Sequence, residues 1–164
     1  MIIKLFITGR TIDCEQINPD TKEYIFSETH LPEMLKRGRN KVDVDLEVLM
    51  LKDSAYMTDS DRENILQKCK SCKEDKIVIT HGTDTIIETA QVLGKNIGDK
   101  TIVLWGAITP YNQKNSDALF NLGSALTAVQ LIPKGVYITM NGKIFPWDNV
   151  FKNKTVQEFE ELNK

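Results

Sequence analysis

Short apolar runs alternate along the chain with longer segments in which apolar residues recur at helical spacing. The short runs are rich in β-branched residues and are bounded by turn or polar residues, which is typical of buried strands. They predict strands at Ile2–Thr8, Val44–Leu51, Ile77–Thr80, Thr101–Trp105 and Val136–Met140.

The segments between these runs predict amphipathic helices. They are expected at Leu31–Arg37, Asp61–Lys73, Asp84–Gly94 and Ser116–Gln130. The last shows the clearest helical spacing, with its apolar residues at Ala118, Leu119, Leu122, Ala125, Leu126 and Val129. Side-chain oxygens can accept from the free N–H groups of a first turn, so the expected N-caps are Asp59 or Ser60, Asp84, and Asn115 or Ser116.

Alternating strands and helices predict an α/β fold. We expect a three-layer α/β/α sandwich with a mostly parallel, doubly wound (flavodoxin/Rossmann-like) sheet and right-handed crossovers. The chain has 164 residues, which is near the size of one domain, so residues 1–164 are predicted to form a single domain.

Polar clusters follow each predicted strand directly. They are Gly9–Thr11, Asp53–Ser54, His81–Thr85, Gly106–Pro110 and Asn141–Lys152. Ligands of such sheets bind outside the carboxyl ends of the strands. The sequence therefore predicts a ligand site at this edge.

Composition argues against several classes of function. Net charge is −2 and the lysines are scattered, so no basic face for nucleic acid is expected. No run approaches the ~18 apolar residues of a membrane span, and the N-terminus does not resemble a signal peptide. Three cysteines do not make a disulfide framework, so a cytoplasmic protein is predicted.

The stretch Thr80–Thr85, "THGTDT", concentrates hydroxyls, a carboxylate and an imidazole at a strand-to-helix turn. Gly82 lets backbone amides face a ligand, and N–H groups at a helix start favour an anion or a developing oxyanion. Thr83 can relay a proton, and Asp84 can orient it or bind an ammonium. A capped turn with Asp84 as N-cap explains the same residues.

A second hydroxyl, that of Thr11, lies in the turn "ITGRTID" after the first strand. A threonine becomes a nucleophile only when a base takes its proton, and Asp84, Lys152 and Tyr24 are the candidate partners. The local sequence does not place Lys152 near Thr83, and a simple turn hydroxyl is the alternative for Thr11.

These two segments, "ITGRTID" and "IVITHGTDTIIETA", resemble the signature segments of the bacterial-type L-asparaginase family, which usually read "TGGTI" and "THGTDT…ETA". "KDSAYMT", "WGAITP", "NSDALFNLGSALTAV" and "VYITMNGKIFPWDNVFKNKT" are similar to later segments of that family in the same order. The resemblance covers the family's N-terminal domain. It implies a short-chain, single-domain member without the usual smaller C-terminal domain.

The resemblance also implies roles for individual residues. Thr11 matches the nucleophile, and Tyr24 matches the activating tyrosine of a loop, from Ile12 to Glu23, that would close as a lid. The matches to the polar triad are Thr83, Asp84 and Lys152. The substrate-binding positions are Ser54 for the α-carboxylate, Ala55 and Gly82 beside it, and the Ala107 carbonyl for the side-chain amide.

The implied reaction is hydrolysis of L-asparagine to L-aspartate and ammonia through a Thr11 acyl-enzyme, with no metal or organic cofactor. Assembly as a homodimer or homotetramer is expected, without nucleic-acid or membrane partners. Arg10 replaces a glycine of the family pattern, and Ala55 replaces a polar residue. The alternatives are therefore a glutamine-hydrolysing or ammonia-supplying amidotransferase-type subunit, and a ligand-binding domain with impaired catalysis.

Two weaker signals have simpler interpretations. Cys69 and Cys72 form a CxxC, but both fall on the apolar face of a predicted helix, so core packing is favoured over metal or redox chemistry. His81 has no nucleophile at a suitable spacing and is interpreted as structural.

Overall fold

A computed structural model describes residues 1–9, 11–13, 16–18, 20, 24–25 and 28–163, with only the backbone described for Thr11, Gln16, Ile17, Tyr24 and Ile25. Its main sheet has six strands in the order β4-β1-β5-β6-β7-β8. The strands are β1 (Ile2–Ile7), β4 (Asp43–Val48), β5 (Lys76–Thr80), β6 (Thr101–Trp105), β7 (Gly135–Met140) and β8 (Lys143–Pro146). All neighbouring pairs are parallel except β7 with β8.

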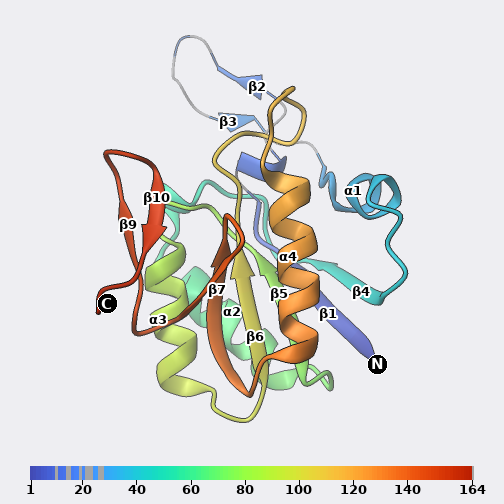
Figure 1. Ribbon diagram of the computed structural model, residues 1–164, viewed down its shortest axis with the longest axis vertical. Coiled ribbons are helices and arrows are strands. Elements are labelled where there is room, and N and C mark those ends of the chain that lie inside the picture. Colours follow the sequence, from blue (N-terminus) through green and yellow to red (C-terminus); the bar gives the residue numbers. More distant parts are fainter. Residues whose placement is uncertain (10, 14–15, 19, 21–23, 26–27, 164) are drawn as a thin grey trace.

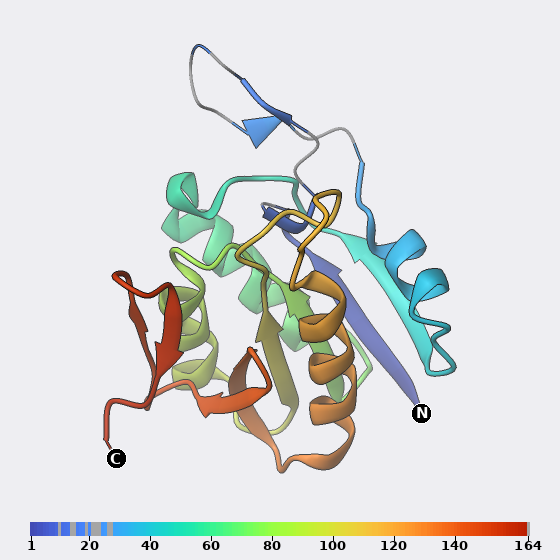
Figure 2. The same cartoon turned by 45° about the horizontal axis from the view of Figure 1, so that its top comes forward.

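Helices cover both faces of this sheet (Figures 1 and 2). On one face α1 (Leu31–Arg37) and α4 (Ala118–Leu131) pack on Leu5, Val78 and Val103. On the other, α2 (Asp59–Ser71) and α3 (Ile86–Asn96) pack on Ile77, Ile79 and Ile102. Successive strand residues point to opposite faces, so runs that are apolar throughout supply both cores. The predicted three-layer, doubly wound fold is confirmed.

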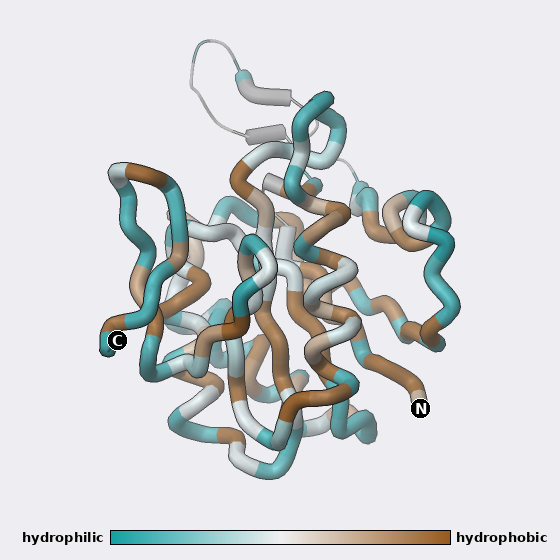
Figure 3. Tube along the Cα trace, in the orientation of Figure 1, coloured by the Kyte–Doolittle hydropathy of each residue, from teal (hydrophilic) through white to brown (hydrophobic). Residues whose placement is uncertain are grey.

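Hydropathy follows this layering. In Figure 3 the hydrophobic stretches run through the central strands, and most of the turns around them are hydrophilic. The buried polar side chains Thr8, Thr80 and Thr83 are exceptions that lie at the ends of strands or just after them. These three buried hydroxyls therefore gather at the carboxyl edge of the sheet.

The order of strands creates a switch point between β1 and β5. From β1 the chain passes through α1 to β4 on one side, and the next strand, β5, pairs with β1 on its other side. Connections thus leave β1 and β5 in opposite directions, which opens a crevice at their carboxyl ends. Thr11 and Thr83 each follow one of these two strands by a few residues.

Several predicted boundaries were wrong, and none of the assigned N-cap residues is a predicted one, although Ser116 Oγ accepts from the Ala118 N–H at 3.1 Å at the start of α4. Strand β4 ends at Val48 instead of Leu51, because Val48 pairs with Ile7, the last residue of β1. Helix α2 is capped by Thr58, which forms a capping box with Asp61. The structure assigns Thr85 and Asp117 as the N-cap residues of α3 and α4, with no side-chain cap bond at either.

The sequence pattern missed the short elements. These are the antiparallel strand β8, the hairpin of β9 (Phe151–Asn153) and β10 (Glu158–Glu160), the pair β2 (Gln16–Ile17) and β3 (Tyr24–Ile25), and the 3-10 turns η1 (Thr11–Asp13) and η2 (Ser54–Tyr56). Strands of two to four residues carry too little periodicity to be recognised. Among the described residues, no helix combines the length and apolarity that crossing a membrane requires.

Candidate active site

The ends of β1 and β5 are joined by a pair of threonines. The Thr8 hydroxyl donates to the Thr80 carbonyl at 2.6 Å, and the Thr8 N–H donates to Thr80 Oγ1 at 3.1 Å. Both side chains are fully buried, so these bonds are protected from water. They hold together the starting points of the two loops that carry Thr11 and Thr83.

Gly9 turns the chain out of β1 with a φ of +88°. A Cβ at this position would lie 2.5 Å from the backbone nitrogen of Lys52. Both the left-handed backbone and the close approach of the segment before Ser54 therefore require glycine. The turn after β1 is pressed against the segment after β4.

The central feature of this edge is a cluster of Lys152, Thr83 and Asp84. Lys152 Nζ donates to Thr83 Oγ1 at 3.0 Å and to Asp84 Oδ1 at 2.9 Å. Thr83 and Asp84 follow β5, whereas Lys152 comes from β9, where it pairs with Phe159 of β10. The hairpin beside α3 thus delivers the lysine to the carboxyl edge of the sheet (Figure 1).

Burial makes the cluster asymmetric. The Lys152 side chain is 7% exposed, while that of Asp84 is 44% exposed. A buried ammonium needs a charged or hydrogen-bonded partner, and Asp84 supplies one while remaining hydrated. Thr83 is 5% exposed and accepts a hydrogen bond from the ammonium, so its hydroxyl proton is directed elsewhere. This arrangement can carry a proton between a group at the edge and the lysine.

The residues matched to substrate binding lie on neighbouring segments. Ser54 is fully buried, and its carbonyl accepts from the Thr85 hydroxyl at 2.8 Å, which ties η2 to the loop after β5. Ala55 is exposed in the same turn. Gly82 is buried beside Thr83, and Ala107 is buried just after β6.

Gly106 brings the loops after β5 and β6 into contact. A Cβ at Gly106 would lie 2.5 Å from the His81 carbonyl oxygen and 2.9 Å from Thr83 Cγ2. The His81 ring is buried, with its Nε2 2.8 Å from the Thr89 hydroxyl and its Nδ1 2.9 Å from the Gly82 carbonyl. These contacts agree with the interpretation of His81 as a structural residue.

Sequence reasoning missed a polar frame behind the Gly106 loop. The Asp117 carboxylate accepts from the Ile108 N–H at 3.0 Å and from Asn121 Nδ2 at 2.9 Å. Asn121 is fully buried, also donates to the Gly106 carbonyl at 3.0 Å and accepts from the Asn141 N–H at 3.0 Å. The available signal was a carboxylate and an amide four positions apart on the buried face of an apolar helix.

The remaining predicted positions are described only in part. The backbone of Thr11 lies in η1 after β1, and that of Tyr24 lies in β3. The side chains of both residues lie outside the described part of the structure, as do Arg10 and most of the predicted lid. The proximity of the Thr11 and Thr83 loops therefore follows from the pairing of β1 with β5.

The CxxC belongs to the core and not to the site. Cys69 is fully buried, Cys72 is half-buried at the end of α2, and neither is in a disulfide. Among the described residues, no group of three or more His, Cys, Asp or Glu side chains could hold a metal ion. Burial raises the pKa of the Cys69 thiol well above its usual value, which keeps it unreactive.

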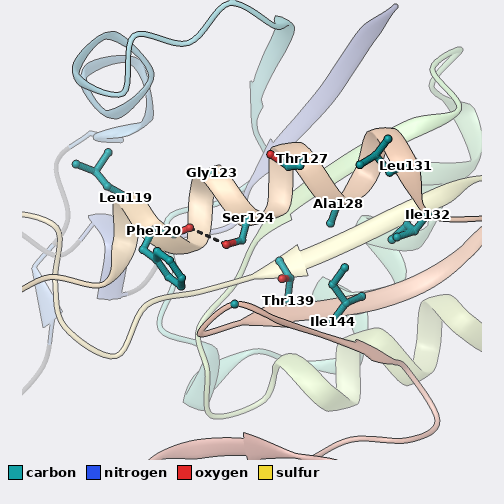
Figure 4. A pocket seen from close by; sticks show the side chains of 11 residues that line it. Leu119, Phe120, Gly123, Ser124, Thr127, Ala128, Leu131, Ile132, Thr139 and Ile144 are labelled. Atoms are coloured by element: carbon teal, nitrogen blue, oxygen red, sulfur yellow. Dashed lines mark hydrogen bonds between the residues drawn. The ribbon is translucent and has the colours of Figure 1, made fainter.

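A large groove lies away from this edge, along the outer face of α4. It has a volume of about 610 Å³ and is lined by residues of α4, β7 and β8 that include Phe120, Thr127 and Ile144. Figure 4 shows the Ser124 hydroxyl bonded to the Phe120 carbonyl on its wall, and the lining is mainly apolar. Its lining includes none of Thr83, Asp84 and Lys152, so it is separate from the cluster.

Comparison with known proteins identifies similar chains. Residues 2–163 match the family model described as "Asparaginase, N-terminal". The chain is 37% identical over 102 residues to a protein of Haemophilus influenzae named "Probable L-asparaginase periplasmic", an alignment that covers 58% of this chain and 29% of that protein. It is 36% identical over 117 residues to a glutamyl-tRNA(Gln) amidotransferase subunit of Methanococcus maripaludis, covering 69% of this chain and 27% of that protein.

Among solved structures, the thermostable L-asparaginase of Thermococcus kodakarensis superposes with a TM-score of 0.86 at 25% sequence identity. The match covers 100% of this chain and 52% of that one. The chain thus spans about half the length of this solved relative, and its alignments with the two curated relatives cover less than a third of either.

Proposed function

This chain belongs to the asparaginase family, and from that premise we propose that it is an L-asparaginase that hydrolyses L-asparagine to L-aspartate and ammonia. Family membership and the structural relative support an amidohydrolase. The observation that carries the proposal is the contact of Lys152 Nζ with both Thr83 Oγ1 and Asp84 Oδ1 at the switch point of the sheet.

We propose that Thr11 is the nucleophile. Its hydroxyl oxygen attacks the carboxamide carbon, and backbone amides near Thr11 and Thr83 stabilise the oxyanion, where one donor is typically worth ~3 kcal/mol. Ammonia leaves, water attacks the resulting ester, and aspartate is released while the Thr11 hydroxyl is restored. The pairing of β1 with β5, which starts both loops at neighbouring points, supports this assignment.

The cluster would move the proton. When the Lys152 amine is neutral it can accept a proton from Thr83, whose oxygen can then take one from the attacking hydroxyl or water. Asp84 would stabilise the ammonium that forms. The hydrogen bonds of 3.0 and 2.9 Å from Lys152 are short enough for this transfer.

Substrate contacts are proposed for the neighbouring segments. Ser54 would hold the α-carboxylate, Ala55 and Gly82 would line the pocket beside it, and the Ala107 carbonyl would accept from the side-chain amide. Supporting observations are the bond from Thr85 to Ser54 and the contact of Gly106 with the loop of Thr83. Tyr24 is proposed to activate Thr11.

The second candidate function is glutamine hydrolysis or ammonia supply to a partner. The identity of 36% with a glutamyl-tRNA(Gln) amidotransferase subunit favours it over other reactions on linear amides. A third candidate is a binding domain with impaired catalysis, motivated by Arg10 and Ala55.

Release of ammonia from L-asparagine and from L-glutamine tests these candidates. We expect turnover of asparagine by the wild-type protein, loss of turnover in Thr11→Ala and Lys152→Ala, and retention in Lys154→Ala, a matched control at a neighbouring exposed lysine. Preference for glutamine would favour the amidotransferase-type function. Aspartate binding without turnover of either amide would contradict the proposal and favour the binding domain.

Assembly, location and extent are also proposals. We propose a homodimer or homotetramer, because the active-site edge of a single domain of this size is exposed and a second copy could cover it. Light scattering of the purified protein would test it, and a monomer at micromolar concentration would contradict it. A cytoplasmic location is proposed from the free thiols of Cys69 and Cys72, although one relative is named as periplasmic, and cell fractionation would decide. That residues 1–164 form a single domain stays a prediction.

A further inference from the structure

A buried carboxylate lies in the same 3-10 turn as Thr11. Asp13 is the last residue of η1, and its side chain has no exposed surface. The residue between them, Ile12, is 1% exposed and packs in the core beneath α1 and α4. The backbone that carries Thr11 is thus anchored by the two residues that follow it.

Asp13 connects this turn to the chain just before α1. Its Oδ1 accepts from the Thr29 hydroxyl at 2.9 Å and from the His30 N–H at 2.9 Å. The Thr29 hydroxyl accepts in turn from the Leu31 N–H at 3.2 Å, and Leu31 is fully buried at the start of α1. One carboxylate oxygen therefore links η1 to a segment 16 and 17 residues later.

The same segment is held from its other side by the loop after β6. The His30 ring packs against the Tyr111 ring with centroids 5.5 Å apart. The Tyr111 hydroxyl donates to Glu33 Oε1 at 3.0 Å, so this ring is fixed to α1 as well. The start of α1 is consequently a firm support for Asp13.

Burial of this carboxylate costs free energy, because a charged group loses its hydration. Its second oxygen, Oδ2, is buried and has no hydrogen-bond partner among the described residues. Burial raises the pKa of Asp13, an effect that the bonds from His30 and Thr29 oppose. An alanine at this position would not bury an unpaired carboxylate oxygen. What Asp13 provides that alanine does not is the pair of hydrogen bonds that Oδ1 accepts from Thr29 and His30.

We propose that Asp13 is a positioning residue: by binding Thr29 and the His30 N–H, it fixes the turn whose backbone carries Thr11 for attack on the amide. This assignment rests on the proposed function. A misplacement of about 1 Å at a reacting group can cost about a hundredfold in rate, so fixing this backbone affects the chemical step. The carboxylate acts through the turn and has no contact with substrate.

The test compares kcat and KM for L-asparagine in wild-type protein and matched variants. Asp13→Ala removes both bonds and should lower kcat by about tenfold to a hundredfold, with KM changed by less than about threefold. Asp13→Asn keeps an acceptor oxygen and should restore kcat to within about threefold of wild type. Thr29→Ala removes one bond and should have an intermediate kcat, whereas Thr29→Ser should behave as wild type.

Lys100→Met serves as the stability control, because Lys100 Nζ donates to the Glu74 carbonyl at 3.1 Å just before β5, at the end of the sheet opposite the site. It should lower the midpoint of unfolding without lowering kcat. Circular dichroism confirms folding before each assay, and if Asp13→Ala does not fold, Thr29→Ala and Thr29→Ser carry the test.

Two results would overturn the assignment while leaving the proposed function intact. The first is a kcat of Asp13→Ala within about twofold of wild type; if that variant does not fold, the same result for Thr29→Ala counts. The second is an equal loss of kcat in Asp13→Asn and Asp13→Ala. If the wild-type protein turns over no amide, the proposed function fails, and this assignment fails with it.

Discussion

Lys152 Nζ lies 3.0 Å from Thr83 Oγ1, although 69 positions separate the two residues in the sequence. Thr83 lies in the turn that follows β5, a strand in the middle of the sheet, and Lys152 lies in a hairpin outside the sheet. The same ammonium contacts Asp84, so a cation, a hydroxyl and a carboxylate share one point at the carboxyl edge. This contact brings together the three groups that the proposed proton relay requires.

The first prediction concerns the Thr83 hydroxyl. Thr83→Val keeps the shape of the side chain but removes the proton relay, and should lower kcat for asparagine by at least about a hundredfold, the usual contribution of acid–base catalysis. Thr83→Ser keeps the hydroxyl and should retain most of the activity. Steady-state ammonia release measures the kcat of both variants. If Thr83→Val were as active as Thr83→Ser, and both were close to wild type, the hydroxyl would be dispensable.

The second prediction concerns the close approach at Gly106. In Gly106→Ala the new methyl group would meet the His81 carbonyl at 2.5 Å and must push two loops apart. Overpacking of this kind typically costs about 1–3 kcal/mol of unfolding free energy, and kcat should fall as Thr83 shifts.

Gly123 is the matched control for Gly106. It lies within α4, and a Cβ there would meet nothing within 4 Å. Gly123→Ala should therefore raise the free energy of unfolding by about 0.5–1 kcal/mol, because alanine favours a helix. Urea denaturation of both variants tests the pair. A Gly106→Ala protein as stable as wild type would mean that the loops yield without strain.

The third prediction is a dependence of stability on pH. Burial of Asp61 opposes ionisation, but the Lys52 ammonium at 2.6 Å and the N–H and hydroxyl of Thr58 outweigh it and lower the pKa of this carboxyl. Its contribution to stability is therefore fully present above the unfolded pKa of about 3.9 and is lost as pH falls through the lower folded pKa.

Asp61→Asn removes this titration. The stability difference between wild type and Asp61→Asn should be constant above about pH 5 and should shrink below about pH 4. Urea denaturation at a series of pH values measures the difference. A difference that grows as pH falls would have the wrong sign for a lowered pKa.

The fourth prediction separates the two cysteines of the CxxC. Cys69 is fully buried and its thiol has a raised pKa, whereas Cys72 is half-buried. In a Cys14→Ser background, iodoacetamide should label Cys72 in the folded protein and Cys69 only after unfolding. Peptide mass spectrometry reads the result. Equal labelling of both under native conditions would contradict the burial of Cys69.

The pattern of the chain was sufficient to predict the main architecture. Five apolar runs became the five parallel strands, and four periodic segments became α1 to α4, because each depends on local spacing. The run predicted as a buried strand at Val44–Leu51 is an exception in its burial, because β4 lies at the edge of the sheet and has no buried residue. Capping was less predictable: Thr58 caps α2 instead of Asp59 or Ser60, since any of several adjacent oxygens can accept the same N–H groups. The edge strand β8 and the hairpin of β9 and β10 were too short to recognise.

The candidate site likewise has features that the sequence predicted and features that it did not. Because every parallel strand ends at one edge, the sequence alone implied that the loops of Thr11, Ser54, Thr83 and Ala107 would gather there. The pattern also put Lys152 in the cluster after the last predicted strand, but its pairing with Thr83 came only from a resemblance. The supports provided by Asp117 and Asn121 were not predicted.

What the sequence by itself determined is the alternation of elements and the edge at which polar loops collect, since hydrophobic periodicity is a local property of the chain. What only the tertiary structure decided is which distant side chains meet: Lys152 with Thr83, and Asp13 with Thr29. The physical reason is that a distance between remote residues depends on every packing contact between them, and no local pattern records that sum.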